Sequence, residues 1–113
     1  MPEPLTPAVF QVLLSLAAGD KHGYAVLKDV EEGSGGEVKL STGTLYAVFK
    51  RLLAEGLIAE CRHRPPVDED DQRRRYYRIT PSGRAVAVAE AERMEKLLVQ
   101  ARGANLIRKL RPA

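Results

Sequence analysis

Apolar residues recur at helical spacing near the start of the chain and predict a first helix that begins at Pro7. Thr6 supplies a hydroxyl N-cap, and proline fits the first helical position because no backbone N–H donor is needed there. The apolar stripe is broad, and it comprises Leu5, Val9, Phe10, Val12, Leu13, Leu14, Leu16 and Ala17. A helix that is apolar on more than one side must be covered on more than one side. The segment 19–23 ends this helix and turns the chain.

Two further helices are predicted before the first strand. The second covers 24–32 and stops at the glycine-rich segment 33–36, and the third begins after Ser41, a good N-cap, and ends at Gly56. On a wheel of about 100° per residue, the buried side of the third helix carries Leu45, Val48, Phe49 and Leu52. Its outward side carries Gly43, Ala47, Lys50 and Ala54, flanked by Thr44, Tyr46 and Arg51.

Two strands joined by a long polar loop follow. Residues 57–62 and 76–80 are predicted to be antiparallel partners, and the loop between them contains the acidic run 68–71. Carboxylates packed in such a loop solvate it, and no metal-ligand spacing accompanies them, so we predict neither a metal site nor a cofactor. Tyr76 and Tyr77 are neighbours in a strand, so one should pack on the core and the other should face outward.

A long helix closes the chain. Thr80 and Pro81 repeat the N-cap and first-turn proline seen at the first helix, and a break is expected at Gly103. Apolar residues alternate at four- and three-residue steps along this helix, at Ala87, Ala91, Met94, Leu98 and Ala101. Such a seam is typical of a coiled coil or of a helix-packing face.

The order helix, helix, helix, strand, wing, strand, long helix predicts a mainly α fold with a small β-hairpin. We interpret 1–80 as a winged helix-turn-helix domain, with the wing at about 58–80, and 81–113 as a C-terminal dimerisation helix. A domain of three short helices has little surface left to cover both a long C-terminal seam and a two-sided first helix. Two copies are therefore expected to pair through 84–110 and part of 5–17.

Composition sets the remaining bounds. The chain has 113 residues, of which 44% are hydrophobic, and this length and composition suit one globular domain. The net charge of +3 permits a nucleic-acid partner. Cys61 is the only cysteine, which excludes an internal disulfide and suits a reducing compartment. The start lacks the pattern of a signal peptide, and no apolar stretch is long enough to cross a bilayer, so we expect a cytoplasmic protein without a membrane partner.

The outward side of the third helix combines small residues with cations, as in a helix that enters the DNA major groove. Gly43 and Ala47 leave room for a duplex, and Lys50 lies where a cation meets phosphate or a base edge. The predicted DNA-contacting residues of the helix are Ser41, Thr42, Gly43, Thr44, Tyr46, Lys50 and Arg51. Beside the wing, at least one DNA contact is expected among Arg73, Arg74 and Arg75.

Residues 22–80 closely resemble the PadR family of transcriptional regulators. The motifs that carry the resemblance are His22-Gly23-Tyr24, Ser41-Thr42-Gly43-Thr44-Leu45-Tyr46, Arg51-Leu52, Glu55-Gly56-Leu57-Ile58, Arg74-Arg75-Tyr76-Tyr77 and Thr80-Pro81-Ser82-Gly83. The resemblance implies a homodimeric winged helix-turn-helix, usually a repressor, whose C-terminal helix pairs the subunits. It also implies release from DNA when a small hydrophobic or phenolic compound binds near the dimer interface. Thr42 stands where proline is usual, and the acidic wing insert also departs from the pattern.

We therefore interpret the chain as a sequence-specific DNA-binding regulator, a repressor that binds a palindromic operator as a homodimer. The side chains predicted to line an effector pocket, or simply to form the dimer core, are Leu5, Val9, Phe10, Leu13, Met94 and Leu98. A winged-helix module that binds protein without touching DNA is the alternative. An enzyme is disfavoured because the sequence offers no nucleophile with its base, no paired carboxylates and no phosphate-cradling glycine loop.

Overall fold

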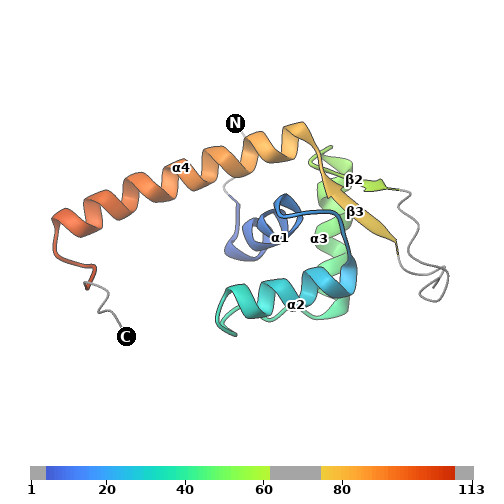
Figure 1. Ribbon diagram of the computed structural model, residues 1–113, viewed down its shortest axis with the longest axis horizontal. Coiled ribbons are helices and arrows are strands. Elements are labelled where there is room, and N and C mark those ends of the chain that lie inside the picture. Colours follow the sequence, from blue (N-terminus) through green and yellow to red (C-terminus); the bar gives the residue numbers. More distant parts are fainter. Residues whose placement is uncertain (1–4, 62–74, 109–113) are drawn as a thin grey trace.

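The computed structural model describes residues 5–61 and 75–108, and in these ranges the chain forms a small antiparallel sheet and four helices (Figure 1). The elements in chain order are α1 (Pro7–Ala17), β1 (Lys21–His22), α2 (Gly23–Gly33), α3 (Thr42–Ala54), β2 (Ile58–Cys61), β3 (Tyr76–Ile79) and α4 (Pro81–Gly103). This order confirms the predicted mainly α winged helix-turn-helix with a C-terminal helix. None of the helices in the described ranges combines the length and apolar character needed to cross a membrane.

The sheet contains one strand more than the sequence predicted. Its order is β1-β3-β2, and both pairings are antiparallel. β1 is only two residues long and pairs Lys21 with Tyr77 and His22 with Tyr76, in the segment predicted as a turn. A two-residue strand shows no alternation of its own, because it exists only through its bonds to β3. Its effect is to tie the end of α1 and the start of α2 to the wing.

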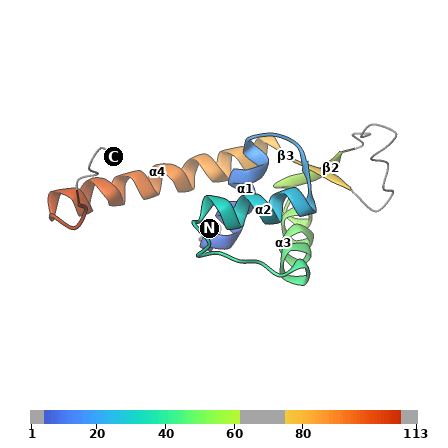
Figure 2. The ribbon, with the colours of Figure 1, turned by 60° about the horizontal axis from the view of Figure 1, so that its bottom comes forward.

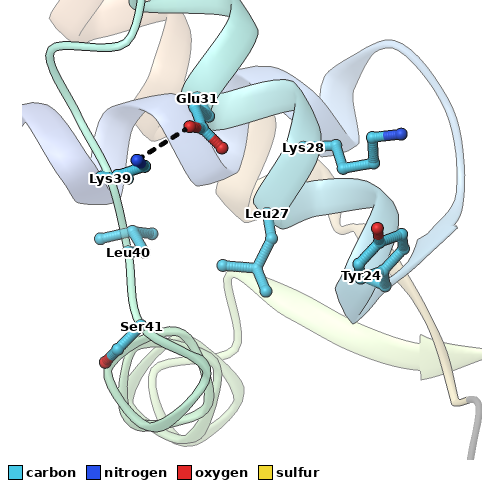
Figure 3. A pocket seen from close by; sticks show the side chains of 7 residues that line it. All are labelled: Tyr24, Leu27, Lys28, Glu31, Lys39, Leu40 and Ser41. Carbon is cyan, nitrogen blue, oxygen red and sulfur yellow. Dashed lines mark ion pairs between the residues drawn. The ribbon is translucent and has the colours of Figure 1, made fainter.

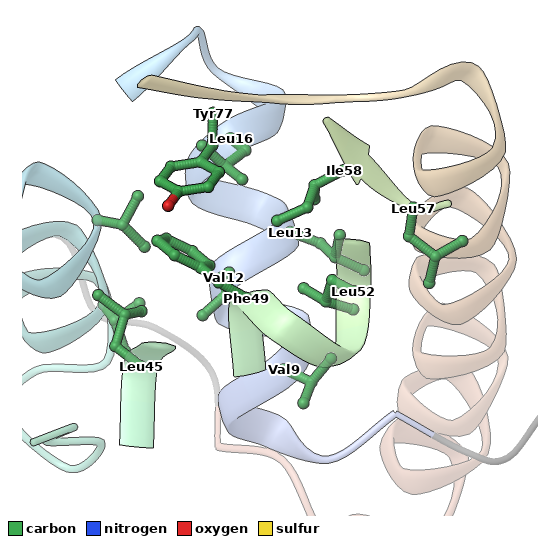
Figure 4. Close-up of a cluster of buried hydrophobic side chains, with 12 residues drawn as sticks. Val9, Val12, Leu13, Leu16, Leu45, Phe49, Leu52, Leu57, Ile58 and Tyr77 are labelled. Atoms are coloured by element: carbon green, nitrogen blue, oxygen red, sulfur yellow. The ribbon is translucent and has the colours of Figure 1, made fainter. Parts of the chain in front are cut away.

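The core lies where α1, α2 and α3 meet one face of the sheet (Figure 4). The ring of Phe49 on α3 packs against the ring of Tyr77 on β3, with 4.3 Å between their centroids. Tyr77 is buried while Tyr76 is only half-buried, so the predicted alternation along β3 is confirmed. The largest fully buried side chains are Phe49, Leu13, Leu16, Leu45, Leu52, Ile58, Val12, Val26 and Val30.

The third helix has the ends and the faces that its sequence predicts. Ser41 is the N-cap, and its hydroxyl accepts a hydrogen bond of 3.0 Å from the backbone N–H of Thr44. Gly56 follows the helix with φ of 72°, and Leu57 N–H returns to the carbonyl of Leu52 at 2.9 Å, which is the bonding of a glycine-terminated helix. The predicted inner residues Leu45, Phe49 and Leu52 are buried and Val48 is half-buried.

The last helix packs on α1 along its first half and then extends beyond the rest of the molecule (Figures 1 and 2). A guanidinium nitrogen of Arg84 donates to the carbonyl of Ala17 at 3.3 Å, which ties the start of α4 to the end of α1. The predicted seam is not evenly buried within the subunit. Ala87, Met94 and Ala101 are half-buried, whereas Ala91 and Leu98 are exposed, and the buried position between them is Glu90. The spacing of the apolar residues alone could not show that the neighbouring Glu90 is the residue that becomes buried.

Candidate nucleic-acid interface

The outward face of α3 presents small and cationic residues to solvent. Gly43, Ala47 and Lys50 are exposed, as are Thr42 and Thr44 near the start of the helix. A Cβ atom added to Gly43 would meet nothing within 4 Å, so the backbone there is open to a close approach from outside. The face is therefore accessible to a rod-like polyanion, because no other described element covers it.

The start of α3 holds two of the predicted contact residues in a fixed arrangement. The hydroxyl of Ser41 donates to that of Thr44 at 2.9 Å while it accepts the backbone N–H of the same residue. Both side chains remain exposed. The first-turn N–H groups of a helix favour negative charge, so a phosphate beside this turn would meet hydroxyl donors and the positive end of the helix dipole.

The Tyr46 side chain extends from α3 toward the start of α2 instead of pointing straight into solvent. A Cβ atom added to Gly23, the first residue of α2, would lie 2.9 Å from the Tyr46 hydroxyl oxygen, so any other residue there would require the end of the Tyr46 ring to move. The ring edge also meets Phe49, with 5.7 Å between centroids. The side chain is still 46% exposed. Its hydroxyl is thus held beside the start of α2, at the junction of the two helices.

The cations of the face differ in their surroundings. Lys50 forms no ion pair within the described ranges, whereas Nε of Arg51 lies 2.8 Å from Oε2 of Glu55. Nε of Arg75 lies 3.5 Å from Oε1 of Glu60 at the outer end of the hairpin. The predicted contacts Arg73 and Arg74, and the acidic run 68–71, lie outside the described residues.

A groove between α2 and the start of α3 adds two lysines that the sequence analysis did not select (Figure 3). Its volume is 470 Å³, with Leu27 and Leu40 among its lining residues. Lys28 lies over the Tyr24 ring, 5.7 Å from its centroid, and Lys39 lies 3.5 Å from Glu31. Lys28 could have been found from its position one turn after Tyr24 on a helix face that the sequence leaves polar. Lys39 has no such signal, because it lies in a non-helical connection.

A half-buried polar cluster fixes α2 to α1 and β1. The hydroxyl of Ser15 donates to Oδ2 of Asp29 at 2.7 Å, and Lys21 forms an ion pair with the same oxygen and donates to the carbonyl of Ser15 at 2.7 Å. The hydrogen bond from Lys21, with a further one from Ser15, holds the pKa of Asp29 below its ordinary value of 3.8 despite partial burial. The cluster thereby fastens α2 to the end of α1 and to β1.

The residues predicted for an effector pocket or dimer core fall into two groups. Val9 and Leu13 are 4% and 0% exposed and belong to the core of their own domain, because they lie on the side of α1 that faces that core. Leu5, Phe10 and Met94 are half-buried, and Leu98 is exposed. None of the six lines the groove beside α2.

One buried charge on α4 was missed by the sequence analysis. Glu90 is 8% exposed, and its carboxylate accepts two hydrogen bonds from Arg93, at 3.0 Å from Nε and 2.5 Å from Nη2. These bonds lower the pKa of Glu90. Within the described ranges, His, Cys, Asp and Glu side chains nowhere gather in a group of three that could hold a metal ion.

Comparison with known proteins identifies the family of the chain. Residues 12–89 match the model of the transcriptional regulator PadR-like family. The chain belongs to this family. Together with the winged helix-turn-helix fold, membership in the PadR-like family supports a DNA-binding transcriptional regulator, a class that is generally not enzymatic.

Solved structures show the same fold. A transcriptional regulator from Clostridium thermocellum is 27% identical, with a TM-score of 0.67 over 89% of this PadR-like chain and 90% of that one. A PadR family transcription regulator from Clostridium difficile is alike in fold, with a TM-score of 0.69, 20% identity and coverage of 87% and 97%. BpsR of Bordetella bronchiseptica, whose DNA binding is regulated by 6-hydroxynicotinic acid, is 26% identical, with a TM-score of 0.66 and coverage of 99% and 73%.

A relative in sequence comes from a mobile element. A 37.1 kDa protein of transposon TN4556 from Streptomyces fradiae is 38% identical over 86 residues. The match covers 76% of the PadR-like chain and 22% of the transposon protein, so the chain spans only a small part of that relative's length.

Proposed function

We propose that this PadR-like protein binds double-stranded DNA as a homodimer and recognises a palindromic operator. The observation that carries the proposal is the exposed outward face of α3, where Gly43 and Ala47 leave space and Lys50 supplies an unpaired cation within the described ranges. A helix of this kind reads base edges in the major groove while flanking cations contact phosphates. Two such helices related by a two-fold axis fit half-sites about 34 Å apart.

Contacts on either side of α3 would set the register on the duplex. Arg75 beside the wing and Lys28 and Lys39 beside the groove are exposed cations from three different segments. Lys28 and Lys39 line the groove that reaches Ser41 at the start of α3, and Arg75 stands on the hairpin. Phosphate contacts from both sides of α3 would fix orientation without reading sequence. Arg73 and Arg74 are assigned to the wing side of the same contact.

The proposed division of labour assigns 1–80 to DNA binding and 81–113 to dimerisation. The second half of α4 extends past its own domain (Figure 2) and carries apolar side chains that are about half exposed, namely Leu97, Leu98 and Val99. Leu14 on α1 is exposed to a similar degree. Pairing of two α4 helices beside α1 would bury these side chains, which the subunit alone leaves in water.

Regulation would act through the spacing of the two α3 helices. We assign repression to the DNA-bound dimer and release to a small hydrophobic or phenolic compound between α4 and α1, near Leu5, Phe10, Met94 and Leu98. The 26% identical BpsR, whose DNA binding is regulated by the aromatic acid 6-hydroxynicotinic acid, supports a ligand of this class. A compound that binds only dimers with one spacing of the two α3 helices shifts the population of dimers toward that spacing.

Selection from a random duplex pool tests the proposal. We expect the enriched fragments to share a two-fold-symmetric motif, and their binding to weaken steeply as salt rises. Binding without any sequence preference would favour a winged-helix module that binds protein. An asymmetric motif would contradict the proposed homodimer but would not contradict the proposed DNA binding.

A further inference from the structure

Two arginines on the proposed DNA-binding face are bonded to carboxylates that lie beside them. Arg51 is hydrogen-bonded through Nε to Glu55, one turn further along α3, at 2.8 Å. Arg75 lies 3.5 Å from Glu60 at the outer end of the hairpin. A DNA phosphate that approaches either guanidinium must therefore compete with the carboxylate that is already paired with that guanidinium.

The position of Glu55 is not explained by the helix that it follows. It is the C-cap residue of α3, and the negative end of a helix dipole disfavours a carboxylate there. Its side chain instead holds Arg51, which stands in the last turn. The interaction with Arg51, and not helix termination, is therefore the physical role that the structure gives Glu55.

Glu60 stands on the α3 side of the hairpin. The register pairs Glu60 of β2 with Tyr77 of β3, and paired residues of antiparallel strands share a face. Tyr77 turns toward α3, since its ring packs on Phe49. Burial, followed by the nearby charge of Glu60, raises the pKa of Tyr77, as expected if the two side chains lie close together. Glu60, and Arg75 two residues before Tyr77, therefore lie on the face of the hairpin that packs on α3.

We propose that Glu55 and Glu60 restrain binding to DNA of any sequence by competing with phosphates for Arg51 and Arg75. The inference rests on the proposed function, since it concerns the same surface. An exposed pair of this kind changes an equilibrium constant by up to about fivefold, and a dimer carries each pair twice. Because phosphate contacts carry no sequence information, the restraint sets how strongly the face holds a duplex and not which sequence it prefers.

The test measures affinity for a scrambled duplex as a function of salt. Glu55→Gln keeps the shape of the side chain and removes a charge that the helix end disfavours, so the fold is retained. We expect on the order of tenfold tighter binding, and a steeper salt dependence by up to about two counterions per dimer. Glu92→Gln makes the same charge change on the exposed side of α4 and should alter the affinity by less than about twofold, because distant charges are screened.

Variants that lack the paired arginine test whether the gain comes from competition for that arginine. In an Arg51→Gln protein the additional Glu55→Gln change should bring no gain, and Glu60→Gln should behave in the same way toward Arg75→Gln. The inference is overturned if Glu55→Gln binds no more tightly than wild type, if Glu92→Gln gives an equal gain, or if the gain persists without Arg51. Wild type that binds no duplex at all removes the proposed function together with the inference. Salt-dependent binding by wild type without a gain in Glu55→Gln removes the inference alone.

Discussion

Gly83, in the first turn of α4, lies directly against the backbone carbonyl of Leu57, just beyond the end of α3. A Cβ atom added to Gly83 would stand 1.9 Å from that carbonyl oxygen. The same oxygen accepts the backbone N–H of Thr80 at 3.1 Å, and the Thr80 hydroxyl donates to the carbonyl of Gly56 at 2.7 Å. The helix proposed to dimerise is thereby fastened to the end of the helix proposed to read DNA.

Replacing Gly83 by alanine should therefore damage the joint. The methyl group can be placed only if the backbone of one segment moves, and overpacking of this kind costs about 3 kcal/mol. For a domain of this size we expect the midpoint of thermal unfolding to fall by roughly 10 °C or more at fixed protein concentration. Circular dichroism during heating measures this change.

The same substitution at the other end of α4 is the matched control. A Cβ atom added to Gly103 would meet nothing within 4 Å, and alanine favours a helix over glycine by up to about 1 kcal/mol. Gly103→Ala should leave the midpoint unchanged or raise it slightly. Equal behaviour of the two variants would contradict the close packing of Gly83 on Leu57.

Lys50 should account for a measurable part of the salt dependence of DNA binding. Removing one phosphate contact lowers the salt slope by about 0.9, so Lys50→Ala should lower it by about two in a dimer, together with the affinity. Fluorescence anisotropy titrations of a labelled duplex at several salt concentrations give both quantities. Lys96→Ala removes the same charge from the exposed side of α4 and should change neither. A slope unaltered by Lys50→Ala would exclude Lys50 from the contact.

Local signals explain how much of the fold the sequence could predict. Thr6, Ser41 and Thr80 each precede a helix and each accept an N–H bond from its first turn, so the helix starts are correct to within a residue. The wheel of α3 is also correct, because its inner and outer sides differ sharply in polarity. Gly83 and Leu57 belong to two motifs of the family resemblance, but their contact follows only from the packing of α4.

Features that depend on distant partners could not be predicted. β1 exists only through its pairing with β3, and the burial of Glu90 depends on how α4 packs on the rest of the subunit. The pairing of Arg51 with Glu55 is an exception, since an i,i+4 spacing on a helix is visible in the sequence. The sequence analysis assigned Arg51 to a DNA contact because of its outward position, and it did not predict the ion pair with Glu55.

Asp29 should make stability fall in acid. Its pKa is lowered in the folded protein, chiefly by the hydrogen bond from Lys21, so its contribution is complete at neutral pH. The contribution is lost as the pH falls from about 3.8 through the lower folded value. We expect Asp29→Asn to reduce the free energy of unfolding by about 1 kcal/mol at most at pH 7, since the pair is partly exposed. The difference from wild type should be smaller at about pH 2, because part or all of the Asp29 carboxylate is then protonated.

Urea unfolding at the two pH values measures that difference. Glu32→Gln removes a carboxylate from the exposed end of α2 that has no ion pair in the described part of the chain, and it should not reproduce the effect. A gap between Asp29→Asn and wild type that is as large in acid as at neutral pH would mean that packing, and not the charge of Asp29, stabilises the junction of α1, β1 and α2.

Leu98→Glu should separate the subunits if α4 pairs them. Leu98 is 51% exposed in the subunit, and a dimer that buries it would have to bury two carboxylates near its axis, each at a penalty of several kcal/mol. We expect the dimer dissociation constant to rise by at least about 100-fold, measured by sedimentation equilibrium, while circular dichroism shows an unchanged helix content. Gln100→Glu makes the same charge change on the polar side of α4 and should leave the dimer intact. If Leu98→Glu remains as dimeric as Gln100→Glu, the subunits must pair through another surface, and the spacing of the two α3 helices must then be set without α4.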